Sequence, residues 1–156
     1  MNKRNIQLNP RTMRGSVAVE LALLLIPLIV LALGVAEFGR AMYQYNTVVK
    51  TVRDAARLLS QHSPSDTANY PETEARCLVV HGSADCSGSA LLPGLTIGMV
   101  GIASSTTTTG AGASINLVTV TVTGYTFNFV FNPLVFFGSS MTTLPFDPIQ
   151  TTMRQL

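Results

Sequence analysis

Residues 16–36 read SVAVELALLLIPLIVLALGVA, and this run of 21 residues decides the architecture of the chain. Glu20 is its only charged residue. A helix over the run would be about 30 Å long, which matches the hydrocarbon thickness of a membrane. Four basic residues and no acidic residue precede it, namely Lys3, Arg4, Arg11 and Arg14. Because basic residues stay on the cytoplasmic side, the pattern predicts a single-pass protein of the inner (cytoplasmic) membrane, with a cytoplasmic N-terminus and an extracytoplasmic domain after Ala36.

The composition limits the rest of the chain to one small domain. The chain has 156 residues, of which 47% are hydrophobic and 12% are charged, so it can build one modest core and is not disordered. Its formal net charge of +2 comes from the leader, because residues 16–156 hold six basic and eight acidic side chains. This balance favours no nucleic-acid partner.

The N-terminal run admits three forms of processing. It can be a permanent signal anchor, a secretory signal peptide cut after Gly34 or Ala36, or a leader cut before the run. A carboxylate inside a membrane span costs roughly 2.5–3.5 kcal/mol and usually has a partner. If the chain is cut between Gly15 and Ser16, the new α-amine lies one helical turn before Glu20 and on the same face. Glu20 therefore favours the third form, with charge pairing inside the chain or between subunits.

The residues around this site carry a family resemblance. The segment Arg14-Gly15-Ser16-Val17-Ala18-Val19-Glu20 resembles the type IV prepilin pattern, in which Gly precedes the cut and Glu is the fifth residue after it. Residues 14–60 resemble the TadE-like family of minor pilins or pseudopilins of tight-adherence (Flp) pilus systems. The matching elements are Gly15, Ala18-Val19-Glu20, Pro27, Glu37-Phe38-Gly39-Arg40 and Asp54-Ala55-Ala56-Arg57. Two features depart from the family pattern: Leu21 replaces a common Phe, and Leu58-Leu59 replace small residues.

The resemblance implies a subunit that supports assembly of a tight-adherence pilus, and through it surface adhesion and biofilm formation, and that can be incorporated in the pilus at the cell surface. Gly15 would be the cleavage residue, Ser16 would supply the amine, and Glu20 would align subunits. The implied partners are a prepilin peptidase, the major Flp pilin, a TadF-like minor pilin, the inner-membrane assembly platform and membrane lipid. Two alternatives stay open: a pseudopilin of a type II-like secretion machine, and a membrane-anchored or secreted ligand-binding domain that residues 1–36 merely export.

The helix is predicted to continue beyond the membrane. Pro27 removes one backbone hydrogen bond and should kink the helix. One apolar stripe with helical spacing comprises Ala41, Tyr45, Val48, Val52, Ala55 and Leu59. The expected organisation is a basic leader over 1–15, a transmembrane half over 16–36, an amphipathic continuation over 37–62 that ends before Ser63-Pro64, and a β-rich domain over 63–156.

The exported part is predicted to be an antiparallel sheet of three to five strands. We expect short strands over 74–81 and 95–103, and the clearest strand over 115–123, where Val and Thr alternate. The apolar parity changes after Gly124, which indicates a bulge or bend. We expect residues 104–114 to form a mobile loop. Residues 134–137 can be core or an exposed docking patch, and we expect core. The fold class is therefore α+β and pilin-like: one long N-terminal helix packed on a small antiparallel β-sheet.

Cys77 and Cys86 are predicted to form a disulfide, because the domain lies outside the cytoplasm. The alternative is a metal site formed by Cys77, His81 and Cys86, with Asp85 as a further ligand. Catalytic motifs such as a P-loop or GxSxG are absent from the sequence, and the neighbouring Glu72 and Glu74 read as solvated turn residues. We therefore expect no cofactor, no metal and no enzymatic activity.

Overall fold

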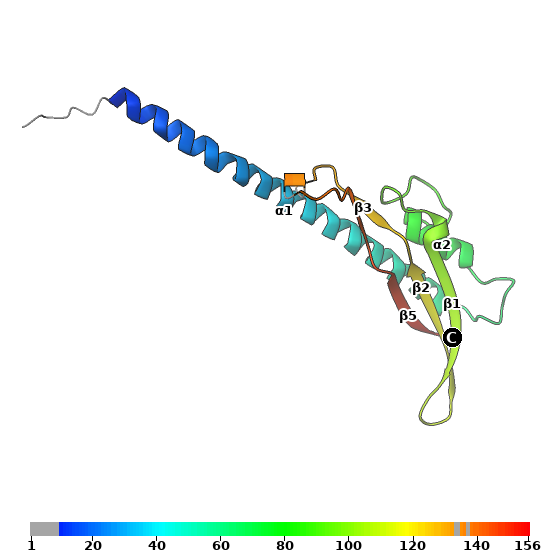
Figure 1. Ribbon diagram of the computed structural model, residues 1–156. Coiled ribbons are helices and arrows are strands. Elements are labelled where there is room, and N and C mark those ends of the chain that lie inside the picture. Colours follow the sequence, from blue (N-terminus) through cyan, green and yellow to red (C-terminus); the bar gives the residue numbers. More distant parts are fainter. Residues whose placement is uncertain (1–9, 133–134, 137) are drawn as a thin grey trace, which may run out of the picture.

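One long helix dominates the architecture. The computed structural model describes residues 10–132, 135–136 and 138–156. Helix α1 (Pro10–Ser60) is 51 residues long. Its N-terminal half projects away from the other elements, whereas its C-terminal half lies along them (Figure 1). An 18-residue window of α1 is apolar enough to cross a membrane, and none of it is buried. The predicted α+β class, with one long helix on a small antiparallel sheet, is confirmed.

The C-terminal half of α1 supplies one wall of the core. Val48, Val52, Ala55 and Leu59 are all completely buried, as the apolar stripe predicts. The stripe weakens toward the apolar half of α1, because Ala41 is half-buried and Tyr45 is exposed. The helix ends at Ser60, two residues before the predicted end, and a turn over residues 61–62 follows it.

A three-stranded antiparallel sheet forms the opposite wall. Its strands are β1 (Val100–Thr108), β2 (Ser114–Val122) and β5 (Ile149–Gln155), in the order β1-β2-β5. Val118, Val120 and Val122 of β2 are buried against the helix side, and the threonines between them point away, so the predicted alternation is confirmed. Two short strands, β3 (Thr126–Asn128) and β4 (Thr143–Pro145), form a separate antiparallel pair.

The predicted strand over 74–81 is wrong. This stretch lies within helix α2 (Glu72–His81), which packs on α1. Ala75 and Val79 are both fully buried at helical spacing, and the acidic side chains of Glu72 and Glu74 lie in the first turn, where they favour the helix dipole. The helix ends at Gly82, which adopts the left-handed conformation with φ 73°. The Val79-Val80 pair favours a strand only when this tertiary packing is ignored.

Two further predictions shift along the chain. The expected strand over 95–103 begins with the 3₁₀ helix η1 (Ile97–Met99) and becomes β1 only at Val100. The expected loop over 104–114 is mostly strand, since residues 104–108 pair with 114–118. Only the turn over 109–113 separates β1 from β2. The threonines of this low-complexity stretch are β-branched and suit an exposed hairpin.

The bend after β2 is present, whereas the expected core position of residues 134–137 is wrong for the two residues of this range that the structure describes. Gly124 has φ 75° between the end of β2 and the start of β3, and the next aromatic side chains, Tyr125 and Phe127, are buried. Val135 and Phe136 are exposed. Leu134 and Phe137 lie outside the described residues.

Candidate functional site: the apolar helix and its exit

The N-terminal half of α1 presents an apolar surface on all sides. The exposed large hydrophobic side chains between residues 15 and 36 are Val17, Val19, Leu21, Leu23, Leu24, Leu25, Ile26, Leu28, Ile29, Leu31, Leu33 and Val35. An uninterrupted apolar surface of this extent is typical of a segment covered by lipid or by other subunits. The structure thus leaves most of the candidate span exposed for such contacts.

The residues predicted for cleavage and pairing lie within α1. A Cβ atom added to Gly15 would meet nothing within 4 Å, so packing within the described residues gives no reason for a glycine here. Ser16 and Glu20 face each other one turn apart, and the Ser16 hydroxyl donates to Glu20 Oε1 at 3.4 Å. The structure therefore brings Ser16 and Glu20 together as the spacing predicts. Residues 1–9 of the expected leader lie outside the described part of the chain.

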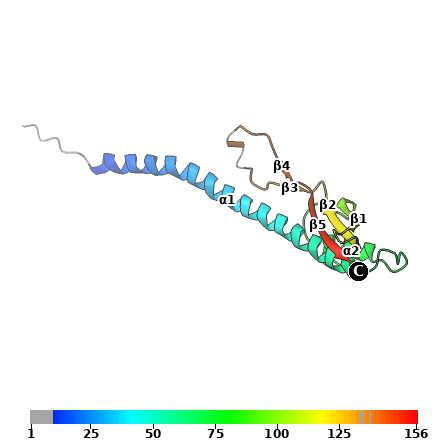
Figure 2. The same cartoon turned by 90° about the horizontal axis from the view of Figure 1, so that it is seen from below.

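Pro27 lies inside α1, which continues on both sides of it. Figure 2 shows α1 curving between its N-terminal half and the part that carries the domain. The bend at Pro27 itself stays a prediction.

A compact polar cluster lies where the apolar half of α1 ends. Glu37, the first residue after the run, is 8% exposed. Arg40 donates one hydrogen bond of 2.6 Å to Glu37 Oε2 and another of 2.6 Å to the carbonyl oxygen of Asn128. The guanidinium carbon of Arg40 also lies 4.3 Å from the ring centroid of Phe127. These contacts join the helix to β3, which is almost 90 residues away in the chain.

The carboxylate of Glu37 also receives the backbone that follows β3. The N–H groups of Val130 and Phe131 donate to Glu37 Oε2 and Oε1, each at 3.4 Å. Burial raises the pKa of Glu37, but the hydrogen bonds from Arg40, Phe131 and Val130 outweigh it and leave this pKa below its ordinary value. Glu37 is therefore a charged group held by three donors. We call Glu37, Arg40, Phe127 and Asn128 the exit cluster.

A second polar contact follows one heptad along α1. Gln44 is buried, and its side-chain oxygen accepts a 2.9 Å hydrogen bond from the hydroxyl of Tyr125. Burial raises the pKa of Tyr125, which keeps the hydroxyl as a donor. The buried face of α1 thus continues from Val48 through Gln44 to Glu37. Its buried side chains are apolar beside the sheet and polar near the apolar half of the helix.

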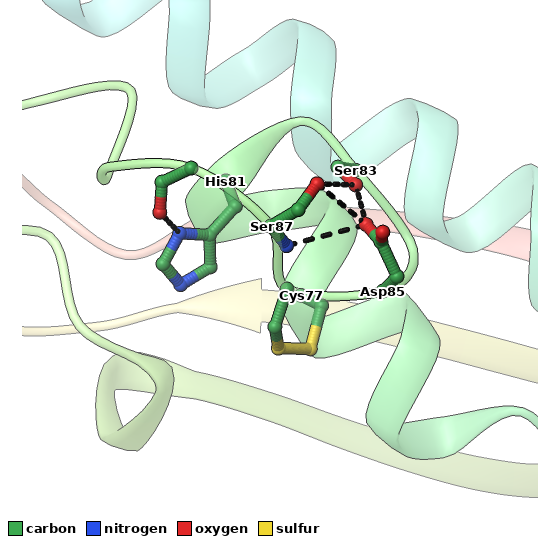
Figure 3. The surroundings of a disulfide bond; sticks show 7 residues. Cys77, His81, Ser83, Asp85 and Ser87 are labelled. Atoms are coloured by element: carbon green, nitrogen blue, oxygen red, sulfur yellow. Dashed lines mark hydrogen bonds between the residues drawn. A yellow bond between two sulfur atoms is a disulfide. The ribbon is translucent and has the colours of Figure 1, made fainter.

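Figure 3 shows the surroundings of the predicted disulfide. Cys77 of α2 and Cys86 are joined, with their Cα atoms 4.7 Å apart. The side chains of Ser83 and Ser87 donate to the carboxylate of Asp85, which lowers the pKa of Asp85 to about 2. His81 Nδ1 lies 3.1 Å from the carbonyl oxygen of Gly88.

This arrangement overturns the alternative metal site. Both sulfur atoms are consumed by the bond between Cys77 and Cys86, so neither is available as a thiolate ligand. Among the residues that the structure describes, no group of three or more His, Cys, Asp or Glu side chains could hold a metal ion. The loop after α2 is therefore closed by the disulfide and held by the hydrogen bonds of Asp85 and His81.

The exit cluster was not predicted as a site from the sequence. Glu37 and Arg40 are three residues apart directly after the apolar run, which is the signal that could have indicated an ion pair. Their partners in and after β3 have no local signal, because only the fold brings residues 127–131 to this point of α1.

Residues 15–57 match the family described as TadE-like protein. The matched segment starts at Gly15 and includes the apolar half of α1, the exit residues and most of the buried stripe. The chain matches no curated protein and no solved structure. The resemblance seen in the sequence is confirmed for this helix: residues 15–57 form a TadE-like segment.

Proposed function

We propose that this chain is a minor pilin or pseudopilin subunit of a tight-adherence pilus, a structural and non-catalytic component that supports surface adhesion and biofilm formation. The observation that carries the proposal is the extent of the TadE-like match. It covers residues 15–57 and includes the apolar half of α1, in which an 18-residue window has no buried residue. A segment with this surface can be stored in a membrane and then packed among the helices of other subunits.

The first chemical step would be cleavage by a prepilin peptidase. Hydrolysis of the peptide bond between Gly15 and Ser16 leaves a carboxylate on the leader and a new α-amine on Ser16. The amine is cationic at neutral pH, and it lies one turn from Glu20, whose contact with Ser16 is already formed. Pairing can occur within one subunit or with Glu20 of a neighbour. It would offset the cost of a carboxylate in apolar surroundings.

The exit cluster gives the helix a firm connection to its domain. Arg40 donates to the carbonyl of Asn128 at the end of β3, and Glu37 accepts from the N–H of Phe131 just beyond it. Tyr125, just before β3, donates to Gln44. A subunit moved by its helix would therefore carry the domain with it. The proposed partners are the prepilin peptidase, the major Flp pilin, a TadF-like minor pilin, the assembly platform and membrane lipid.

The pairing role is tested with Glu20→Ala in the native host. The variant should insert in the membrane, because it removes a charge from the span, but pilus assembly should fail. Glu72→Ala, which changes an exposed glutamate of α2, is the control and should assemble normally. Normal piliation of Glu20→Ala would contradict the pairing role.

Export of a fragment from residue 37 onward separates this proposal from the ligand-binding alternative. If residues 1–36 only export the domain, the fragment delivered by an unrelated cleavable signal should restore function. The pilin proposal predicts that it fails, since the assembly surface is gone. Co-purification with the Flp pilin, and not with secretion pseudopilins, is expected for the full chain.

A further inference from the structure

The segment between β3 and β4 has an unusual position. We call the described residues of this segment, 129–132, 135–136 and 138–142, the apolar loop. Figures 1 and 2 both show this part of the chain reaching back from the domain along α1, toward the half that projects. Phe136 lines a shallow apolar cavity together with four residues of the candidate span, namely Ile26, Pro27, Val30 and Leu31. The loop therefore lies beside the membrane-spanning part of α1.

The position along α1 gives the depth of the loop. The apolar run ends at Ala36, and Leu31 and Ile26 lie five and ten residues inside it. At 1.5 Å per residue, these positions are about 8 and 15 Å inside the end of the run. With α1 across a bilayer about 30 Å thick, Phe136 would lie at the level of the acyl chains of the outer leaflet.

The side chains of the apolar loop suit this environment. No charged residue occurs anywhere between Asp85 and Asp147. Val130 is 84% exposed, Val135 and Phe136 are each 61% exposed, and Met141 is 50% exposed. Exposed apolar surface costs about 25 cal/mol per Å² in water, and transfer to hydrocarbon removes this cost.

Irregular backbone in lipid is costly unless its polar groups have partners within the protein. The apolar loop meets part of this requirement, with help from Glu37 at its root. Its backbone N–H groups with acceptors in the chain are those of Phe129, Val130, Phe131, Val135, Gly138 and Met141. The Asn132 side-chain amide donates to the carbonyl oxygen of Met141, and Pro133 has no N–H group.

The exit cluster fixes the root of the loop at the membrane boundary. Glu37 accepts hydrogen bonds from Val130 and Phe131, and Arg40 holds the carbonyl of Asn128. The charged groups thus stay at the end of the span while the uncharged part of the loop extends past them along α1.

We infer that the apolar loop forms a second membrane-contacting element, which inserts beside α1 into the outer leaflet and binds lipid acyl chains through Val135 and Phe136. The inference rests on the proposed membrane insertion of residues 16–36. It adds to that insertion a contact made by the exported domain, which would hold the domain close to the membrane surface before assembly.

The chain contains no tryptophan, so a single introduced tryptophan reports its own depth. The full chain carrying Phe136→Trp is reconstituted in vesicles of phosphatidylethanolamine and phosphatidylglycerol with brominated acyl chains, and fluorescence quenching is measured. Leu31→Trp, within the span, is the positive control. Ala111→Trp, in the β1–β2 turn that points away from the N-terminal half of α1 (Figure 1), is the negative control.

The expected result is that Phe136→Trp is quenched as strongly as Leu31→Trp, whereas Ala111→Trp is not quenched. Quenching of Leu31→Trp alone would overturn the inference and leave the span in place. A blue-shifted Phe136→Trp emission without quenching would show that protein, such as a second copy of the chain, covers the loop, and would also overturn it. Absence of quenching in both Phe136→Trp and Leu31→Trp would overturn the membrane insertion of residues 16–36 itself.

Discussion

Glu37 is the residue on which the junction between helix and domain depends. It is buried, it is charged, and it accepts from Arg40 and from two backbone N–H groups. A buried carboxylate is stable only while such donors surround it. Within the described part of the chain, the buried Nε atom of Arg40 has no hydrogen-bond partner. The ion pair with Glu37 is therefore one of the few contacts that hold the Arg40 guanidinium.

Glu37→Ala should therefore destabilise the domain by about 1–3 kcal/mol, because it leaves donors without their acceptor. Urea unfolding of the full chain in detergent measures this loss. The matched control is Glu72→Ala, which removes the half-exposed partner of Arg76 and should cost about 0–1 kcal/mol. Equal losses in the two variants would show that the exit cluster is no more than a surface ion pair.

The lowered pKa of Glu37 predicts a specific dependence on pH. In the unfolded chain, the Glu37 carboxyl has the ordinary glutamate pKa of about 4.3. Since the folded pKa is lower, the carboxylate stabilises the fold fully above that value, and this stabilisation is lost as the pH falls through the folded pKa.

Thermal unfolding of the wild-type chain and of Glu37→Gln should therefore differ most at neutral pH and converge as the pH falls below about 4.3. Asp85, whose pKa is also lowered, is present in both chains and cancels in the comparison. A difference in Tm that stays constant from neutral to acidic pH would rule out titration of Glu37 as its cause.

Among the elements, α2 shows what a covalent link adds to a short helix. It has ten residues, a length at which an isolated helix is marginal. Packing of Ala75 and Val79 on the core and the bond from Cys77 to Cys86 hold it in place.

The double variant Cys77→Ser/Cys86→Ser should lose about 2–3 kcal/mol, as expected when a short loop is no longer closed in the unfolded state. Adding reductant to the wild-type chain should cause the same loss, and adding it to the double variant should cause none. Thiol quantitation under denaturing, non-reducing conditions should find no free thiol. Two free thiols would contradict the disulfide.

Local pattern predicted some elements and not others, for physical reasons. In β2, Val118, Val120 and Val122 alternate with threonine, and one buried face suffices to specify the strand. In α2, the adjacent Val79 and Val80 are both buried, so the sequence shows neither the helical nor the strand spacing of apolar residues clearly. Packing on α1 decides that this segment is a helix. The threonines after Gly101 read as low complexity, yet pairing with β2 orders them into a strand.

At the scale of the whole molecule, the chain divides into an exposed N-terminal half of α1 and a domain built on its C-terminal half. The uncovered half follows directly from residues 16–36, because an apolar run of membrane length needs no tertiary information to be recognised. The tie could not be predicted, since Arg40 meets Asn128 and Gln44 meets Tyr125 across more than 80 residues of sequence. The apolar loop escaped prediction for the same reason: exposed aromatic residues look like core until the fold places them beside a span.

Processing after Gly15 is the central claim, because the roles of Ser16 and Glu20 depend on it. The most direct test is the intact mass and N-terminal sequence of the protein recovered from native host membranes. We predict a chain that starts at Ser16. A start near Val35 or Glu37 would identify an ordinary signal peptide, and an uncut Met1 would identify a plain anchor; either result would contradict the proposed function.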